Sequence, residues 1–341
     1  MITRATKYAL IAFISLCSSI ANGQDITKVG TTAAKFLNIP VGARALGMGG
    51  AFVSIADDAT SMYWNPGGMA RLTNNEFFVM HSEWLADISF DFVAFVLPIG
   101  QGAAGINLTA MTMGEFDVTT EEFPEGTGET FSASSYAVGF TYAHNLTSDF
   151  SIGANFKYIT EKISNSSANS IAVDIGTLFK TPFAGIRLGA SISNFGEKMQ
   201  ISGDDLLVQK DIEPQISGNN PNVNAFLATE KFDLPLLLRI GISWEAINNE
   251  TNRLTLAIDG AHPNDNEEFI NVGGELGLFS ETIFIRGGYK SIFLENQEEK
   301  FAFGGGFQYK VATGLNMAAN YAFEQFEHFD NVHKFSFTLQ F

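Results

Sequence analysis

The feature that most constrains this chain is an alternation of apolar and polar residues that recurs in segments of about ten residues. A period of two indicates β-strands, because successive side chains of a strand point to opposite faces of the sheet. About ten residues is also the length that a tilted strand needs to cross a bilayer. The alternation therefore favours an all-β protein, either a transmembrane barrel or a soluble sandwich, whose strands alternate as well. In the segment 150–158, for example, one face carries Phe150, Ile152, Ala154, Phe156 and Tyr158.

The order of short and long connections separates these two folds. Short turns such as 99–101, 145–148 and 181–184 alternate with longer connections, notably 113–130 and 194–235. One rim of short turns and one rim of long loops is typical of outer-membrane barrels. We therefore predict a transmembrane antiparallel β-barrel of about 14 strands, with both chain termini on the short-turn, periplasmic side. The expected strands are 74–82, 88–98, 102–112, 131–144, 149–160, 168–180, 185–193, 236–245, 252–260, 270–279, 282–290, 300–310, 312–322 and 332–341.

The composition agrees with a wall that faces lipid. Charged residues make up 17% of the chain, against roughly 25% in typical soluble domains, and Phe occurs 32 times. A formal net charge of −17 excludes electrostatic binding of nucleic acid, and the single Cys excludes a disulfide scaffold. No run of 18 apolar residues is present, so we expect no transmembrane helix.

The first 23 residues have the layout of a secretory signal peptide. Arg4 and Lys7 form a positive region, an apolar stretch covers 9–16, and Ala21-Asn22-Gly23 is a small-residue cleavage site. We expect the mature chain to begin at Gln24 and to reach the bacterial outer membrane. The predicted organisation is a signal peptide over 1–23, an N-terminal hatch over 24–72 and the barrel over 73–341.

The C-terminus carries the pattern of a closing barrel strand. Phe335, Phe337, Leu339 and the terminal Phe341 share one face. A chain that ends on an aromatic residue with this spacing resembles the signal read by the barrel assembly machinery. The same four residues also suit the lipid face of the last strand, and both interpretations can hold together.

Residues 31–72 do not alternate like a strand. Gly47, Gly49 and Gly50 permit a close backbone approach, Asp57 and Asp58 precede a short apolar helix, and Asn65-Pro66-Gly67 is a strong turn signal. We predict that this compact segment is a hatch inside the lumen, where irregular backbone is satisfied by the wall and by water. The alternative is an ordinary periplasmic turn before the first strand.

The same residues carry a resemblance to a known family. The motifs are Phe36-Leu37, Gly42-Ala43-Arg44-Ala45-Leu46-Gly47-Met48-Gly49-Gly50-Ala51-Phe52, Ala56-Asp57-Asp58-Ala59 and Tyr63-Trp64-Asn65-Pro66-Gly67-Gly68. They resemble the PorV/PorQ family of Bacteroidetes outer-membrane proteins, and the Asn-Pro element is similar to the wider FadL-like family of hydrophobic-compound transporters. Gly67 stands where FadL-like members usually carry Ala.

The resemblance implies a fourteen-stranded barrel with an N-terminal hatch and leaves two functions open. A PorV-like protein takes part in type IX secretion, binding the translocon and the C-terminal signal domains of secreted cargo. A FadL-like protein moves small apolar molecules across the outer membrane. We expect the secretion role first and the transport role as the alternative, with outer-membrane lipid or lipopolysaccharide as a further partner in either case.

An enzyme is the least expected class. No Gly-x-Ser-x-Gly elbow accompanies the five His residues, and we expect neither a cofactor nor a metal site.

The long loops are acidic, for instance at Glu121-Glu122, which suits either a solvated surface or divalent cations beside lipopolysaccharide. The side chains expected to face the lumen are small and polar, namely Ser89, Asp91, Asn155, Asp174, Asp259, Asn316 and Asn320.

Overall fold

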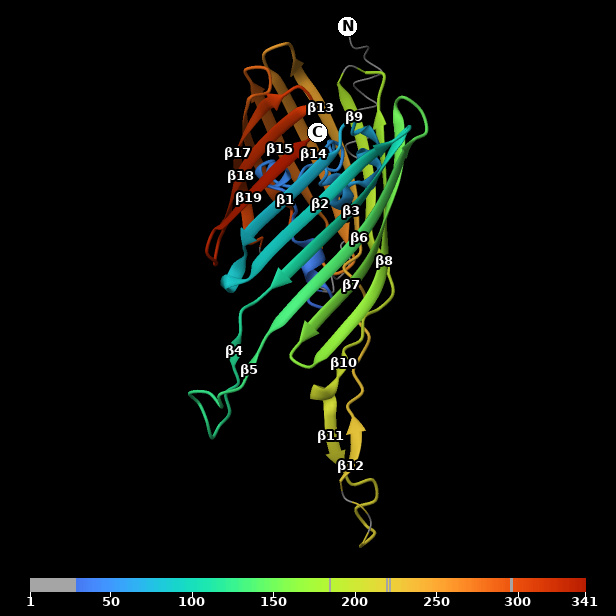
Figure 1. The fold of residues 1–341 in the computed structure, drawn as a ribbon, viewed down its shortest axis with the longest axis vertical. Helices are drawn as coiled ribbons and strands as arrows, with labels where there is room; N and C mark the ends of the chain where they lie inside the picture. Colours follow the sequence, from blue (N-terminus) through green and yellow to red (C-terminus); the bar gives the residue numbers. More distant parts are fainter. Residues whose placement is uncertain (1–28, 184, 219, 221, 295–296) are drawn as a thin grey trace.

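A computed structural model of the chain describes residues 29–183, 185–218, 220, 222–294 and 297–341. Fourteen long antiparallel strands pair in sequence order, and the first strand pairs with the last, which closes the sheet into a barrel (Figure 1). The strands are β1 (Glu76–Glu83), β2 (Ser89–Ile99), β3 (Gly102–Thr112), β6 (Ala133–Asn145), β7 (Phe150–Ile163), β8 (Ser166–Lys180), β9 (Ile186–Gly196), β13 (Leu237–Asn248), β14 (Arg253–Pro263), β15 (Phe269–Leu278), β16 (Ile283–Ile292), β17 (Glu299–Ala312), β18 (Leu315–Phe326) and β19 (Val332–Gln340).

The predicted fold class is confirmed, and each expected strand overlaps one barrel strand. The wall needs no other partner for its backbone, because every long strand has two neighbours and no edge is left open. Among the described residues, no helix is both long and apolar enough to span a membrane, a finding that does not bear on β-barrels. The predicted signal peptide and its cleavage site lie outside the described residues.

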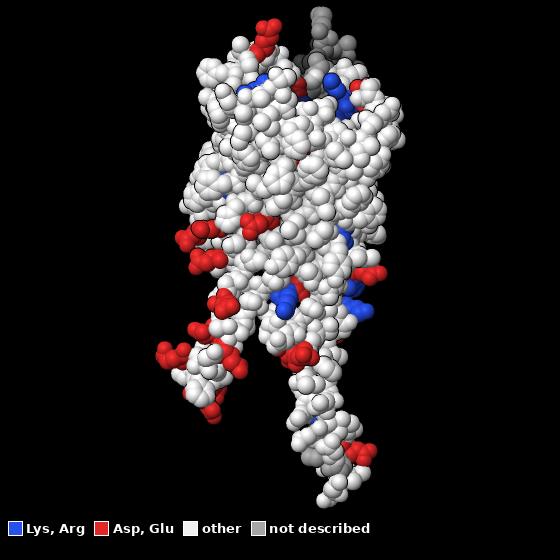
Figure 2. Space-filling model, viewed as in Figure 1, with Lys and Arg blue, Asp and Glu red and all other residues white. Residues whose placement is uncertain are grey.

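The two rims differ as the connection lengths predict. The long connections extend beyond the barrel as two arms, which contain the ribbons β4 (Phe116–Asp117) with β5 (Thr130–Phe131) and β11 (Leu207–Lys210) with β12 (Val223–Phe226) (Figure 1). The two-residue β10 (Ser202–Gly203) extends the sheet from β8 on the same side. The arms carry most of the acidic residues visible on this face, whereas the middle of the barrel is almost free of charge (Figure 2).

The outer face of the wall is apolar and the inner face carries most of the buried polar groups. On β7, Ile152, Phe156 and Tyr158 are exposed, whereas Ser151 and Asn155 are buried inside. The same division holds on β8, β14 and β18, where the predicted lumen-facing residues Asp174, Asp259, Asn316 and Asn320 are found on the inner face.

The prediction that Ser89 and Asp91 face the lumen is wrong. Phe90 and Phe92 of β2 are buried on the inner face, and Asp91 points outward, where its Oδ1 lies 2.7 Å from Nδ1 of His81. Strand β2 carries apolar residues on both faces, so alternation defines its two faces without showing which one meets lipid. The orientation of β2 is decided by an apolar segment that packs against β1 and β2 inside the barrel.

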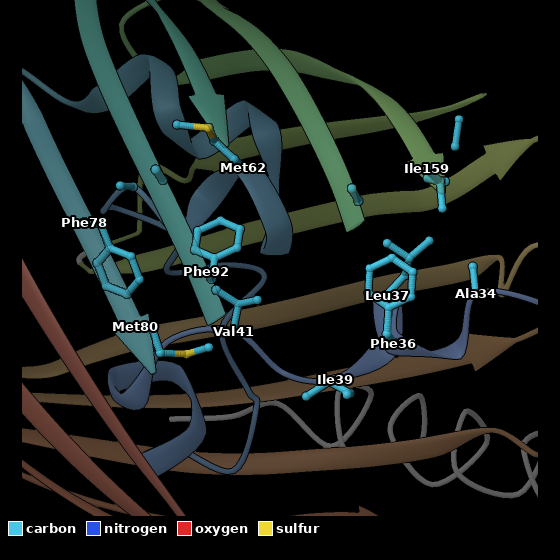
Figure 3. Packing of buried hydrophobic residues seen from close by; sticks show 14 of the residues in the cluster. Ala34, Phe36, Leu37, Ile39, Val41, Met62, Phe78, Met80, Phe92 and Ile159 are labelled. Carbon is cyan, nitrogen blue, oxygen red and sulfur yellow. The ribbon is translucent and has the colours of Figure 1, made fainter. Parts of the chain in front are cut away.

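This N-terminal segment, residues 29–72, lies within the ring of strands (Figure 1). It contains short helices only: η1 (Lys35–Asn38), α2 (Ala43–Gly47), α3 (Ser61–Trp64) and η2 (Pro66–Arg71). Its apolar side chains, such as Val41 and Met62, form one core with Phe78, Met80 and Phe92 of the wall (Figure 3). The last helix of the segment is η2, and the first strand of the wall, β1, begins at Glu76.

The two ends of the described chain lie at opposite rims. The C-terminal Phe341 exchanges backbone hydrogen bonds with Asn75 at the short-turn rim. Near the start of the N-terminal segment, the Ala33 N–H donates to the Asp233 carbonyl at the long-loop rim, over 2.9 Å. The expectation for the C-terminus is therefore confirmed, and the N-terminus itself falls outside the described residues. The N-terminal segment runs through the lumen from the long-loop rim to the short-turn rim.

Candidate functional site

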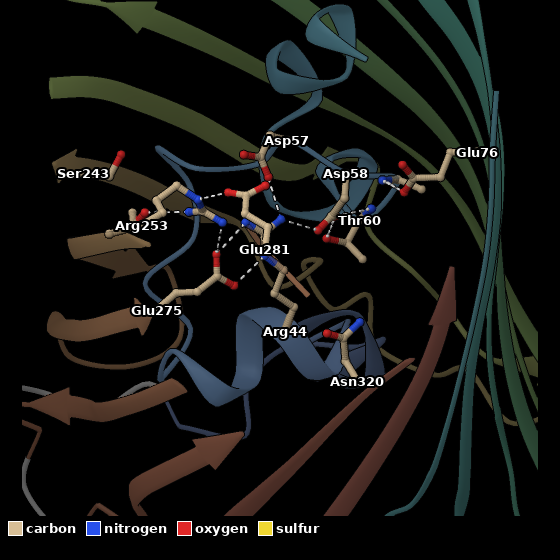
Figure 4. A network of polar contacts seen from close by, with 12 residues as sticks. Arg44, Asp57, Asp58, Thr60, Glu76, Ser243, Arg253, Glu275, Glu281 and Asn320 are labelled. Atoms are coloured by element: carbon tan, nitrogen blue, oxygen red, sulfur yellow. Dashed lines mark hydrogen bonds and ion pairs between the residues drawn. The ribbon is translucent and has the colours of Figure 1, made fainter. Parts of the chain in front are cut away.

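Arg44 of α2 ties the N-terminal segment to the wall through partly buried ion pairs (Figure 4). Its Nε and Nη2 donate to the two carboxylate oxygens of Glu275 on β15, over 2.9 and 3.0 Å. Its Nη1 donates to Asp57 Oδ1 at 2.6 Å and to Asp58 Oδ2 at 3.1 Å. Bidentate arginine–carboxylate contacts fix geometry as well as charge. One side chain thus holds α2, the Asp57-Asp58 turn and the wall in a single arrangement.

Glu275 is the centre of this network. It is fully buried, and it also accepts from Arg286 at 2.6 Å and from Arg253 at 2.9 Å. Three guanidinium groups around one carboxylate offset the cost of burying its charge. Removing Glu275 would therefore leave the buried Arg286 and the partly buried Arg44 and Arg253 without their common partner.

Asp57 and Asp58 are adjacent but have different environments. Burial raises the pKa of the Asp57 carboxyl, yet Arg44 and Arg187 outweigh that effect and hold it below its usual range. Burial raises the pKa of Asp58 above its usual range, with Asp57 adding to the rise and Arg44 opposing it. Asp58 also accepts from the backbone N–H of Thr60, the residue that precedes the short α3 helix. The N-cap of α3 is thus Thr60 rather than either aspartate, and the two aspartates supply the N-terminal segment's carboxylates to Arg44.

Asn65 links three stretches of backbone. It is extended, with φ −161°, as expected for a residue that precedes Pro66. Its Nδ2 donates to the carbonyls of Val53 at 2.8 Å and of Thr177 on β8 at 2.9 Å, while its Oδ1 accepts from the Gly67 N–H at 3.1 Å. The Asn-Pro-Gly element therefore joins the turn, the middle of the N-terminal segment and the wall.

The predicted glycines lie where the N-terminal segment touches the wall. Gly49 and Gly50 have φ values of +65° and +76°, which favour glycine. A Cβ on Gly47 would lie 3.0 Å from Cα of Gly304, and one on Gly49 would lie 3.0 Å from the backbone nitrogen of Tyr289. The wall also has glycines that leave room for the segment's backbone or side chains, one each on eight strands: Gly105, Gly153, Gly176, Gly189, Gly241, Gly273, Gly288 and Gly304.

Two cavities lie on opposite sides of the N-terminal segment. The long-loop cavity has a volume of 390 Å³ and a mixed lining. Aromatic and apolar residues such as Trp64, Trp84, Leu237 and Phe269 stand beside cations, amides and the carboxylates of Asp265, Glu298 and Glu299. The short-turn cavity has a volume of 430 Å³ and is lined mainly by the charged network, including Arg44, Asp57, Arg187 and Arg253. The N-terminal segment contributes residues to both linings, Trp64 to the long-loop cavity and Arg44 and Asp57 to the short-turn cavity, so both cavities border the segment.

The charged partners of Arg44 in the wall were not predicted from sequence to form a site, since Glu275, Arg253 and Arg286 sit alone in strands. Asp259, which the sequence placed on the lumen side, accepts from the backbone N–H groups of Phe52 and Val53 at 2.7 and 2.8 Å. An unpaired charge on the polar face of a barrel strand is the only sequence signal for such residues. Which charges meet depends on the position of the N-terminal segment, which the strand pattern does not contain.

The four residues of the predicted assembly signal share the outer face of the closing strand. Phe335 and Phe341 are exposed, and Phe341 stacks on Phe95 of β2 with ring centroids 6.5 Å apart. Their inward neighbour Lys334 is buried and donates to the Pro40 carbonyl at 2.6 Å. The aromatic residues of the closing strand therefore face outward from the barrel, while its inner face contacts the N-terminal segment.

Comparison with known proteins supports this architecture. The family model described as an uncharacterised protein family, UPF0164, matches residues 9–167, slightly less than half of the chain. No match is found among curated proteins. Among solved structures, the Ralstonia pickettii toluene transporter TbuX is 13% identical with a TM-score of 0.55, and the match covers 88% of this chain and 97% of that one.

Two further solved structures agree with this match. The Pseudomonas putida toluene transporter TodX is 12% identical with a TM-score of 0.56, covering 88% of this chain and 97% of that one. A Pseudomonas aeruginosa FadL homologue is 11% identical with a TM-score of 0.55, covering 89% of this chain and 98% of that one. At such identities the likeness shows the fold, which is that of FadL-type outer-membrane channels. The finer resemblance to PorV/PorQ stays a prediction.

Proposed function

We propose that this protein is an outer-membrane channel that admits small apolar molecules from the side of the long loops. The observation that carries the proposal is the long-loop cavity, because its volume of 390 Å³ and a lining that combines aromatic surface with a few polar groups suit a small organic ligand. The barrel fold supports it, since the similar solved structures include two toluene transporters. Of the two functions expected from sequence, the cavity and the similar structures support transport rather than type IX secretion.

In this proposal the N-terminal segment is the hatch. A ligand in the long-loop cavity meets Trp64, Gly50 and the stretch from Asn38 to Pro40, all of which belong to that segment. The charged network on its other side fixes it to the wall. Passage therefore requires the hatch to shift, and the cavity is the place where a ligand would first contact it.

Entry of an apolar fluorophore into intact cells tests the proposal. Cells whose outer membrane excludes 1-N-phenylnaphthylamine should take it up faster when they produce this protein. Asn38→Trp places an indole at a residue that lines the cavity and should return uptake to the level of cells without the protein. Gln200→Trp adds the same side chain at an exposed loop position and should leave uptake unchanged. Equal uptake by both variants, at equal outer-membrane levels, would contradict the proposal.

A further inference from the structure

We propose that a groove on the outer wall of the barrel binds an outer-leaflet lipid whose headgroup carries a primary amine. The groove has a volume of 560 Å³ and follows the outward faces of β13, β14 and β15 to the long-loop rim. Leu238 and Ile240 of β13 and Gly260 of β14 line it, together with Glu267 and Glu268 of the connection that precedes β15. Because the groove lies outside the lumen, this inference goes beyond the proposed function and does not depend on it.

The floor of the groove is a gap in the apolar wall. Gly260 is paired with Ile240 on one side and with Ile270 on the other, so a row across three strands reads Ile-Gly-Ile. The backbone at Gly260 does not have a positive φ, and the atom closest to an added Cβ would be the Ile240 carbonyl oxygen, at 3.9 Å. Neither conformation nor packing requires a glycine here. The missing side chain leaves a slot that the hydrocarbon of a lipid can fill.

Polar groups lie at the rim end of the groove. His262 is the next outward residue of β14 after Gly260, and its Nδ1 lies 2.8 Å from Oε1 of Glu268. Within the described part of the chain, Glu267 has no ion pair and no hydrogen bond to its side chain. No Lys or Arg is among the described residues that line the groove. The rim end is therefore acidic, and the carboxylate of Glu267 is available to an incoming cation.

The position and the charge of the groove together indicate its occupant. The outward face of a barrel wall meets lipid, and the long-loop rim lies at the outer leaflet. A lipid chain in the slot at Gly260 would place its headgroup beside Glu267. A primary ammonium group offers a carboxylate three N–H donors and an opposite charge, which makes a charge-assisted hydrogen bond. A quaternary amine has the charge without the donors, and a phosphate without an amine would be repelled by Glu267 and Glu268.

Native mass spectrometry of the full-length protein in detergent tests the proposal. The protein is titrated with one short-chain lipid at a time, and the affinity of the first bound lipid is measured. The probes are phosphatidylethanolamine, phosphatidylcholine and phosphatidylglycerol with identical acyl chains. The intact protein should bind the ethanolamine lipid about tenfold more tightly than the glycerol lipid, which is the ratio that a charge-assisted hydrogen bond supplies. The choline lipid should lie between the two.

Two variants examine the two ends of the site. Glu267→Gln keeps the shape of the side chain and removes its charge, so the ratio should fall to about threefold or less. Gly260→Leu fills the slot and should weaken the binding of all three lipids about tenfold. Gly287→Leu adds the same side chain at an outward position where a Cβ would meet only a ring carbon of Phe303, and Glu250→Gln removes an exposed charge from a short turn. Both controls should bind lipid like the intact protein.

The outcomes that would overturn the proposal are distinct. Equal affinity for the three lipids, or an unchanged preference in Glu267→Gln, would refute the selectivity for an amine. Unchanged affinity in Gly260→Leu would place the bound lipid elsewhere on the wall. If the intact protein binds no lipid and instead forms a dimer that Gly260→Leu disrupts, the occupant is a second copy of the chain. Heat-dependent gel mobility shows whether the barrel of each variant is assembled, so that a loss of binding is assigned to the groove.

Discussion

At Gly288 the wall and the N-terminal segment approach so closely that a hydrogen atom is the largest side chain that fits. A Cβ at this position would overlap the backbone of Met48 and Gly49. The neighbouring Gly287 faces the other way, and a Cβ there would meet only a ring carbon of Phe303, at 3.9 Å. Two adjacent glycines of one strand therefore have different roles, and only the position of the N-terminal segment distinguishes them.

We expect Gly288→Val to loosen the N-terminal segment without unfolding the barrel. Overpacking of this kind costs about 1–3 kcal/mol, which would favour the undocked segment about 5- to 150-fold. Single-channel recordings should show raised conductance for Gly288→Val. Gly287→Val is the matched control and should conduct like the intact protein. Equal conductance of the two variants would mean that the close approach at Gly288 does not hold the segment in place.

The two faces of the closing strand β19 have different surroundings. Its inner face contacts the N-terminal segment through Lys334, whereas its outer face presents Phe335 and Phe341. Its backbone completes the sheet by pairing with β1 along the full length of that strand. Because strand closure uses the backbone of β19 and the predicted assembly signal consists of its outward side chains, a change at the last residue should separate the two.

We expect Phe341→Asp to reduce the amount of protein in the outer membrane while export to the periplasm continues. The direct cost of a charge near the membrane interface is small, about 0–1 kcal/mol, so most of the loss would come from recognition by the assembly machinery. Fractionation followed by immunoblotting measures both pools. Phe293→Asp, on an exposed loop residue, is the control for an added charge. Normal outer-membrane levels of Phe341→Asp would refute the signal role.

At the scale of the whole molecule, the wall and the N-terminal segment differ in how far each depends on the other for its structure. The wall satisfies its own backbone by strand pairing around the complete ring. The N-terminal segment has only short helices, and its charges and amide groups depend on wall residues such as Glu275 and Asp259. The barrel should therefore persist without the segment, whereas the segment should have no stable fold without the barrel.

Deletion of residues 31–72 tests this asymmetry. The shortened protein should assemble with unchanged heat-dependent gel mobility, because the strand pairing of the wall is complete without the segment. It should conduct small ions far better than the intact protein in planar bilayers, since the material between the two cavities is removed. If the deleted and intact proteins conduct alike, the N-terminal segment does not close the lumen.

The sequence by itself determined the wall. Each expected strand matches an observed one within a few residues, because strand side chains must alternate wherever lipid lies outside and polar groups lie inside. The order of short turns and long loops then predicted which connections lie at each rim of the barrel, since connection length is a local property of the chain. The Asn65-Pro66 geometry was also readable, because proline restricts its neighbour whatever surrounds it.

Only the tertiary structure decided which wall residues the N-terminal segment would engage. Asp91 faces outward and Phe90 inward because an apolar core lies behind β2, and alternation alone treats the two faces alike. Glu275 gains its three arginines from α2 and two strands, and Arg239 lies over the rings of Tyr63 and Trp64 of the N-terminal segment. These outcomes depend on contacts between residues far apart in the chain, and local pattern carries no information about such contacts.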